Sequence, residues 1–146
     1  MKEIFSIGYE THTPLTFFAR LKREGVECLI DVRNVPASRK PGFSKKALTA
    51  ACEENGIRYV HLQKLGNPKN IRDKIKVGKL TVDEWKREFE KYLGSVPEEL
   101  DRLIELATGR KSCVMCLEHS HTLCHRDIIL RALGRTMKTA QIVYLE

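Results

Sequence analysis

Short apolar runs alternate with amphipathic segments along the chain. Five runs have the length and composition of buried strands. They are residues 4–8, 28–32, 57–62, 112–117 and 141–145. Segments between them carry apolar residues three and four positions apart, as in Leu15, Phe18 and Leu21, which predicts helices with one buried face. This alternation predicts a single α/β domain, a Rossmann-like three-layer sandwich whose five-stranded, mostly parallel sheet has helices on both faces.

Capping and breaking residues indicate where the helices begin and end. The predicted starts are Thr13-Pro14, Ser44, the capping box Thr81-Val82-Asp83-Glu84, Pro97 and Thr122, and the predicted ends lie near Gly25, Gly56, Leu93, Gly109 and Leu133. Residues 64–80 are predicted to form a loop too long for a simple connection, and such loops are usually functional or mobile.

The composition narrows the class of protein. The chain has 146 residues, 42% of them hydrophobic and 31% charged, which excludes a disordered chain. No apolar run approaches the ~20 residues of a membrane-spanning helix, and the first residues lack the zones of a signal peptide. An odd number of cysteines, 5, suits a reducing compartment. We therefore expect a cytoplasmic protein that does not associate with membranes.

The formal net charge of +7 is concentrated in two segments that follow predicted strands. Residues 33–46 contain five Lys or Arg and no acid, and residues 64–79 contain six Lys or Arg and one acid. Ligands of open α/β sheets bind beyond the carboxyl ends of the strands, so this cationic edge favours an anionic ligand, either a nucleotide or a nucleic acid. The alternative is a solvated lysine-rich surface that binds nothing.

The densest reactive cluster spans residues 116–126, with three of the five histidines and two of the five cysteines. Strand alternation places Cys116 and Glu118 on one face, whereas Cys113 points to the other. Cys113-x-x-Cys116 is therefore a poor metal or redox pair, and Cys113 is expected in the core, like Cys28 and Cys52. Cys124, His125 and Arg126 fall in the first turn of the next predicted helix. The unpaired backbone N–H groups of such a turn attract anions and lower the pKa of a thiol.

Four interpretations of this cluster stay open. In the first, Arg126 and the helix start bind a phosphate or carboxylate while Glu118 or His125 transfers protons. In the second, Cys116 or Cys124 is a covalent nucleophile or a member of a redox couple. In the third, both cysteines and neighbouring histidines bind zinc, but the spacing matches no standard zinc-finger pattern and we predict no metal. In the fourth, the cluster is structural and Arg126 pairs with Glu118.

Four ordered groups of residues also carry a family resemblance. They are Ser6-Ile7-Gly8-Tyr9; Asp31-Val32-Arg33 with Pro36, Ser38-Arg39 and Gly42-Phe43-Ser44; Gly56-Ile57-x-Tyr59 with Leu65-Gly66; and Cys116-x-Glu118 followed by Cys124-His125-Arg126. Through them nearly the whole chain resembles the family known as domain of unknown function 488. The resemblance implies an α/β domain with a site at its strand ends, and it implies no reaction. It gives no support to His119 and His121.

Both lines of reasoning predict one pocket at the carboxyl-terminal edge of the sheet. The expected anion-binding residues are Arg33, Ser38, Arg39, Arg126 and Tyr9, with Tyr9 and Phe43 stacking a base or forming an apolar wall. The expected reactive residues are Cys116, Glu118, Cys124 and His125. We expect an enzyme or enzyme-like domain that binds a phosphate-bearing ligand, and no cofactor is indicated. The alternatives are a non-catalytic nucleic-acid-binding module and a thiol-based redox or transferase protein that uses Cys116 or Cys124.

Overall fold

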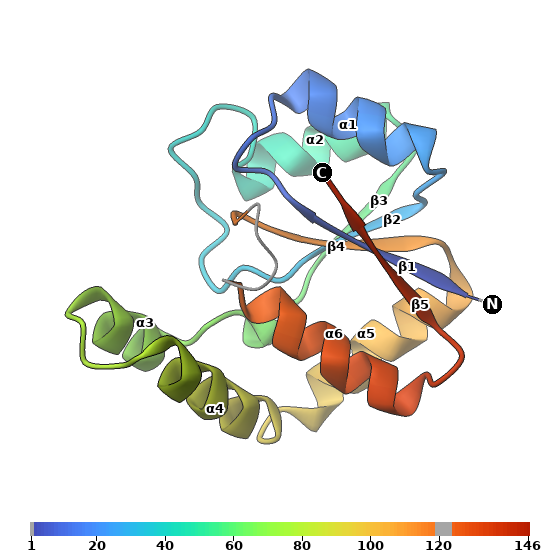
Figure 1. The fold of residues 1–146 in the computed structure, drawn as a ribbon. Helices are drawn as coiled ribbons and strands as arrows, with labels where there is room; N and C mark the ends of the chain where they lie inside the picture. Colours follow the sequence, from blue (N-terminus) through green and yellow to red (C-terminus); the bar gives the residue numbers. More distant parts are fainter. Residues whose placement is uncertain (1, 119–123) are drawn as a thin grey trace.

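A five-stranded parallel sheet runs through the centre of the molecule, with helices on both faces (Figure 1). The computed structural model describes residues 2–118 and 124–146. The strands are β1 (Glu3–Gly8), β2 (Cys28–Asp31), β3 (Arg58–His61), β4 (Ser112–Cys116) and β5 (Gln141–Leu145), in the spatial order β3-β2-β4-β1-β5. Each neighbouring pair is parallel. The predicted α/β sandwich is confirmed, and its sheet is wholly parallel.

The helices form the outer layers. They are α1 (Pro14–Arg23), α2 (Lys45–Glu54), α3 (Lys69–Lys76), α4 (Val82–Leu93), α5 (Pro97–Gly109) and α6 (His125–Thr136), with a short 3-10 helix, η1, at Gln63–Leu65. Helices α1 and α2 cover one face of the sheet, and α5 and α6 cover the other, with α3 and α4 extending from that side (Figure 1). In the described part of the chain, no helix is long and apolar enough to span a membrane.

The prediction of a loop over residues 64–80 is wrong where α3 forms. Its sequence carries four Lys or Arg among eight residues, and this charge obscures a narrow apolar face. Ile71 is buried in the core beneath the helix, whereas the cations lie around it at the surface. A helix this short is stabilised by such tertiary packing rather than by intrinsic propensity. The predicted start of the last helix, Thr122, lies outside the described residues.

Side-chain caps fix the helix starts as predicted at three positions. The hydroxyls of Thr13 and Thr81 form capping boxes, and Ser44 Oγ accepts a hydrogen bond from the first turn of α2. At the start of α6 the N-cap is Cys124, whose Sγ accepts from the backbone N–H of Arg126. The cap that starts α6 therefore also fixes the position of the Cys124 sulfur.

Each face of the sheet has its own hydrophobic core. Phe5, Ile7 and Cys113 point into the core beneath α1 and α2, whereas Cys116 packs on the opposite face beneath α4, α5 and α6. This confirms that Cys113 and Cys116 do not face each other. Cys28 and Cys52 are also buried free thiols, as predicted.

The topology opens a crevice at the carboxyl ends of the central strands. β1 and β4 are neighbours, paired from Phe5 with Cys113 to Gly8 with Cys116. The chain leaves β1 for α1 on one face and leaves β4 for α6 on the other (Figure 1). Because adjacent strands send their helices to opposite faces, the loops diverge and leave room for a ligand between them.

Gly66 lets the segment after η1 approach the chain that leaves β2. Its φ of −77° is accessible to any residue, so its conformation does not require glycine. A Cβ at this position would instead overlap the backbone of Arg33 and Asn34. The glycine of the Leu65-Gly66 motif is therefore explained by backbone-to-backbone contact beside the crevice.

We predict that Gly66→Ala lowers the free energy of unfolding by about 1–3 kcal/mol, because two backbone segments must separate. Denaturant unfolding measures this loss. Gly134→Ala in α6 is the control: nothing lies within 4 Å of the added Cβ, so a gain of about 0.5–1 kcal/mol is expected from helix propensity. Equal unfolding midpoints for the two variants would contradict the explanation.

Candidate functional site

A pocket of about 410 Å³ lies at the carboxyl ends of β1, β2 and β4. We call it the strand-end pocket. Its wall includes Tyr9, Arg33, Asn34, Asn67, Arg72, Lys76, Trp85, Cys116, Glu118 and His125. The lining combines cations, a carboxyl group, an imidazole and a cysteine sulfur, so it contains groups for both binding and chemistry.

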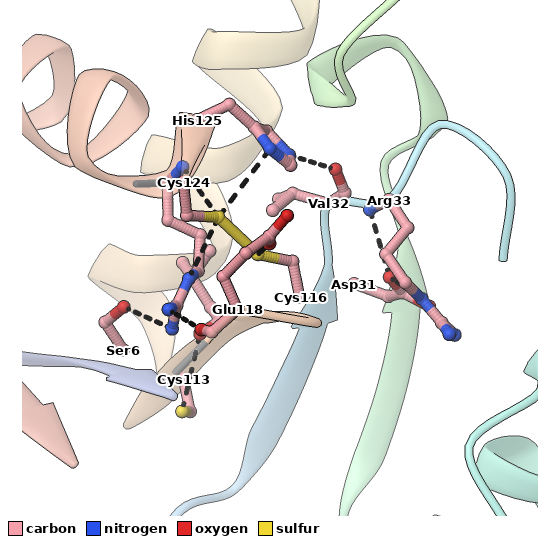
Figure 2. Close-up of a disulfide and its surroundings, with 11 residues drawn as sticks. Ser6, Asp31, Val32, Arg33, Cys113, Cys116, Glu118, Cys124 and His125 are labelled. Carbon is pink, nitrogen blue, oxygen red and sulfur yellow. Dashed lines mark hydrogen bonds and ion pairs between the residues drawn. A yellow bond between two sulfur atoms is a disulfide. The ribbon is translucent and has the colours of Figure 1, made fainter. Parts of the chain in front are cut away.

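Two cysteines meet at the inner wall of this pocket. The sulfur atoms of Cys116, at the end of β4, and Cys124, at the start of α6, are paired as a disulfide (Figure 2). Cys116 lines the pocket, and both residues pack against the core beneath α6. The sequence predicted that either thiol was reactive. It did not predict their pairing, because a separation of eight residues is no standard motif.

Glu118 contacts the sulfur of Cys116 from the pocket side. Its Oε2 lies 3.1 Å from Cys116 Sγ, as strand alternation predicts for these two residues. Burial raises the pKa of the Glu118 carboxyl, an effect that Arg126 partly opposes. Once the disulfide is reduced, a carboxyl group in this position can accept the proton of the Cys116 thiol when ionised and return it when neutral.

His125 is held on the other side of the sulfur pair. Its Nε2 lies 2.8 Å from the carbonyl oxygen of Val32, which only accepts hydrogen bonds, so Nε2 carries the ring proton. The unprotonated Nδ1 therefore faces Cys124 Sγ, at 3.7 Å. Burial lowers the pKa of His125 to about 4, which keeps the imidazole neutral at physiological pH.

Arg126 is buried beside Cys124 and does not line the strand-end pocket. Its guanidinium donates to Ser6 Oγ at 3.1 Å, to Cys124 Sγ at 3.4 Å and to the carbonyl oxygen of Glu118. The side chain is 1% exposed, and burial lowers the pKa of Arg126. Arg126 therefore pairs with the backbone of Glu118, with Ser6 and with a sulfur. Its predicted role in anion binding stays a prediction.

Arg33 forms an ion pair with Asp31. Its Nε and Nη2 donate to the carboxylate of Asp31, with a shortest distance of 2.7 Å, and its Nη1 donates to the carbonyl oxygen of Phe43. Tyr59 donates a further hydrogen bond to Asp31, which is fully buried. Burial would lower the pKa of Arg33, but its bonds to Asp31 outweigh burial and raise it. Arg33 therefore serves as part of the pocket wall.

Tyr9 and Phe43 stack on each other. Their ring centroids are 4.6 Å apart and their planes differ by 8°. Both are buried, although Tyr9 also borders the pocket, where its hydroxyl oxygen accepts from Arg33 at 3.3 Å. Tyr9 therefore lines the pocket and Phe43 packs against it, and the predicted stacking of a base stays a prediction.

Ser38 and Arg39 lie outside the pocket wall. Ser38 Oγ accepts from the backbone N–H of Lys40, and Arg39 is exposed on the loop after β2. Two cations that we did not single out, Arg72 and Lys76, occupy the wall instead. They belong to the charged segment 64–79, and a helical reading of that segment would have placed them on one face. His119 and His121, two histidines near the cysteines, lie outside the described residues.

We predict that Asp31→Asn lowers the free energy of unfolding by about 3–5 kcal/mol, since it leaves the buried charge of Arg33 without a counter-ion. Tyr59→Phe removes one hydrogen bond to the same carboxylate and should lower it by only about 0.5–1.5 kcal/mol. Both losses are measured by denaturant unfolding. Similar losses in the two variants would show that the ion pair does not stabilise this part of the fold.

Comparison with known proteins places these residues in a family. No curated protein and no solved structure matches the chain. One family model matches over residues 14–133, which contain the loop after β2, α3, the sulfur pair and most of α6. The family carries no assigned reaction in its description. The match covers most of the chain, and we conclude that the protein belongs to the family described as domain of unknown function DUF488.

Proposed function

We propose that this domain is an enzyme that uses Cys116 and Cys124 as a dithiol–disulfide couple, acting on an anionic disulfide bound in the strand-end pocket. The observation that carries the proposal is the pairing of the two sulfur atoms at the wall of a pocket that also holds cations and Glu118. It joins two predictions from the sequence, a phosphate-bearing ligand at this sheet edge and a thiol-based reaction.

Arg72 and Lys76 are the groups that would bind the anion. Asn67 and Asn34 hold the Arg72 guanidinium through its Nε and Nη2, each at 3.0 Å. Within the described residues, Arg72 Nη1 and Lys76 Nζ have no hydrogen-bond partner in the protein, so their N–H groups remain for a ligand. A phosphate or carboxylate group is the natural acceptor for such donors. Arg33 contributes little, because Asp31 neutralises it.

Cys116 is the attacking thiol, because it lines the pocket and Cys124 does not. The Glu118 carboxylate accepts the Cys116 proton, and the thiolate attacks one sulfur of the bound disulfide. The substrate S–S bond breaks as the bond to Cys116 forms. The first leaving thiolate takes the proton from Glu118 and departs as a thiol. The products of this step are a mixed disulfide on Cys116 and one molecule of thiol.

Cys124 then resolves the mixed disulfide. Its thiolate, whose proton has passed to solvent, attacks Cys116 Sγ and forms the Cys116–Cys124 disulfide, while the second substrate thiolate leaves and takes a proton from solvent. The substrate gains two electrons and two protons, and the dithiol loses them. Two N–H groups of Arg126, from the backbone and the guanidinium, donate to Cys124 Sγ and stabilise its negative charge.

A nucleic-acid-binding module, the alternative predicted from charge, would use the same cations without the thiols. Binding to random DNA or RNA that falls steeply with salt and is unchanged by Cys116→Ala would support that module. The size of the pocket and the sulfur pair in its wall favour a small anionic molecule instead.

We predict that Cys124→Ser accumulates a mixed disulfide at Cys116 after treatment with a small disulfide, because the resolving thiol is missing. Mass spectrometry of the intact protein measures the adduct. Cys116→Ser should form no adduct, and Cys52→Ala should behave as the wild-type chain, since burial raises the pKa of Cys52 to about 12. An adduct that forms equally without Cys116 would overturn its assignment as the attacking thiol.

We predict that exchanging Arg72 and Lys76 together for Gln slows oxidation by an anionic disulfide about 10-fold at low salt, because the attraction of the pocket for the ligand is lost. Stopped-flow measurement of the rate is compared with that for a neutral disulfide, which should change less than about twofold. Lys69→Gln, on the same helix but outside the pocket wall, is the matched control. Equal slowing with both disulfides would contradict anion binding at this site.

A further inference from the structure

The sulfur pair and His125 have the donor atoms of a metal site. One donor atom from each of Cys116, Cys124 and His125 lies within 4.8 Å of the others, and all three residues cluster at the end of β4 and the start of α6. Thiolate and imidazole are the ligands preferred by zinc and similar thiophilic ions. Two cysteines and one histidine also form one of the known ligand sets of zinc ions that keep one position open.

The ring of His125 is already oriented as a metal ligand. Its Nε2–H donates to the carbonyl oxygen of Val32 at 2.8 Å, and the lone pair of Nδ1 points toward the sulfur pair (Figure 2). Metal-bound histidines almost always donate their second ring N–H to a backbone carbonyl or carboxylate, which fixes the tautomer. Phe89 packs edge-on against the ring, with centroids 5.4 Å apart, and restricts its rotation.

The surroundings of Cys124 suit a thiolate ligand. Its sulfur accepts from the backbone N–H and from Nε of Arg126, both at 3.4 Å. Among the described residues, no carboxylate lies within ion-pair distance of the Arg126 guanidinium, although it is 1% exposed. These two N–H donors stabilise the negative charge that a metal-bound thiolate keeps on its sulfur.

The spacing of the two backbones leaves room for an ion. The Cα atoms of Cys116 and Cys124 are 7.9 Å apart. Two zinc–sulfur bonds of about 2.3 Å at a tetrahedral angle separate the sulfur atoms by about 3.8 Å. Once the disulfide is reduced, small side-chain rotations therefore open the space for a metal ion without requiring the two backbones to separate.

We propose that the reduced protein binds one zinc-type divalent ion through Cys116, Cys124 and Nδ1 of His125. The fourth position opens to the strand-end pocket, because Cys116 and His125 both line it. Glu118, 3.1 Å from the Cys116 sulfur, stands beside that position. The ion and the disulfide use the same sulfur atoms, so oxidation releases the ion: a disulfide reagent takes two electrons from the two thiolates and leaves as two thiolates. The inference goes beyond the proposed function and does not depend on it.

Cobalt(II) is the probe, because tetrahedral thiolate-bound cobalt has intense visible bands and a near-ultraviolet sulfur-to-metal charge-transfer band. The full chain is reduced under anaerobic conditions and titrated with Co²⁺. We expect saturation at one ion per chain with both spectral features, and displacement by Zn²⁺. Failure of the reduced wild-type protein to develop the charge-transfer band would overturn the proposal.

Variants test the three ligands. Cys116→Ser and Cys124→Ser should weaken the charge-transfer band and raise the dissociation constant for Co²⁺ at least about 10-fold, as should His125→Ala. Cys52→Ala, a buried thiol in the other core, should leave the titration unchanged. Circular dichroism confirms that each variant is folded. Wild-type affinity in the folded Cys124→Ser and His125→Ala variants would overturn the ligand assignment.

Oxidation of the wild-type chain gives a test that needs no variant. Protein oxidised by a disulfide reagent should take up no Co²⁺ at this site, and dithiol reduction should restore one ion per chain. His125→Ala separates this inference from the redox proposal, because it should lose the ion and still form the Cys116–Cys124 disulfide. A reduced wild-type chain that binds Co²⁺ but never forms the disulfide would overturn the redox function and leave the metal site standing.

Discussion

The buried guanidinium of Arg126 joins the three elements that form the site. It donates to Ser6 of β1, to Glu118 after β4 and to Cys124 at the start of α6. These bonds hold the segment after β4 against the helix that follows it, so the positions of both sulfur atoms depend on them. A lysine cannot replace this planar set of donors, which reaches three acceptors on different elements.

Some charged side chains near the pocket stabilise the fold, and others are positioned to bind a ligand. Asp31 neutralises Arg33 within the wall, and the pair stabilises the loop after β2 without adding net charge to the pocket. Arg72 and Lys76 come from α3, at the pocket rim, where their charge is not balanced in this way. In the proposed function the excess of cations therefore acts on a ligand through α3, whereas the charge of Arg33 in the inner wall belongs to a closed ion pair.

The proposed redox couple and the proposed metal site depend on the same physical arrangement. Both require a sulfur pair at a pocket wall and N–H donors that stabilise charge on Cys124, and the metal site also requires His125, whose Nδ1 faces the sulfur atoms. The two states exclude each other because each uses both sulfur atoms. Such a site links the oxidation state of the protein to its metal content without any large movement of the fold.

The sequence by itself determined the α/β class, the three capped helix starts and the opposite orientations of Cys113 and Cys116, because period and capping are local properties of the chain. It also located the reactive residues at strand ends, where topology gathers them. Only the tertiary structure decided that Cys116 pairs with Cys124, that Arg126 is buried outside the pocket lining, and that two cations of α3 line the pocket. These outcomes depend on which atoms meet across elements, and neither residue type nor spacing along the chain specifies those distances.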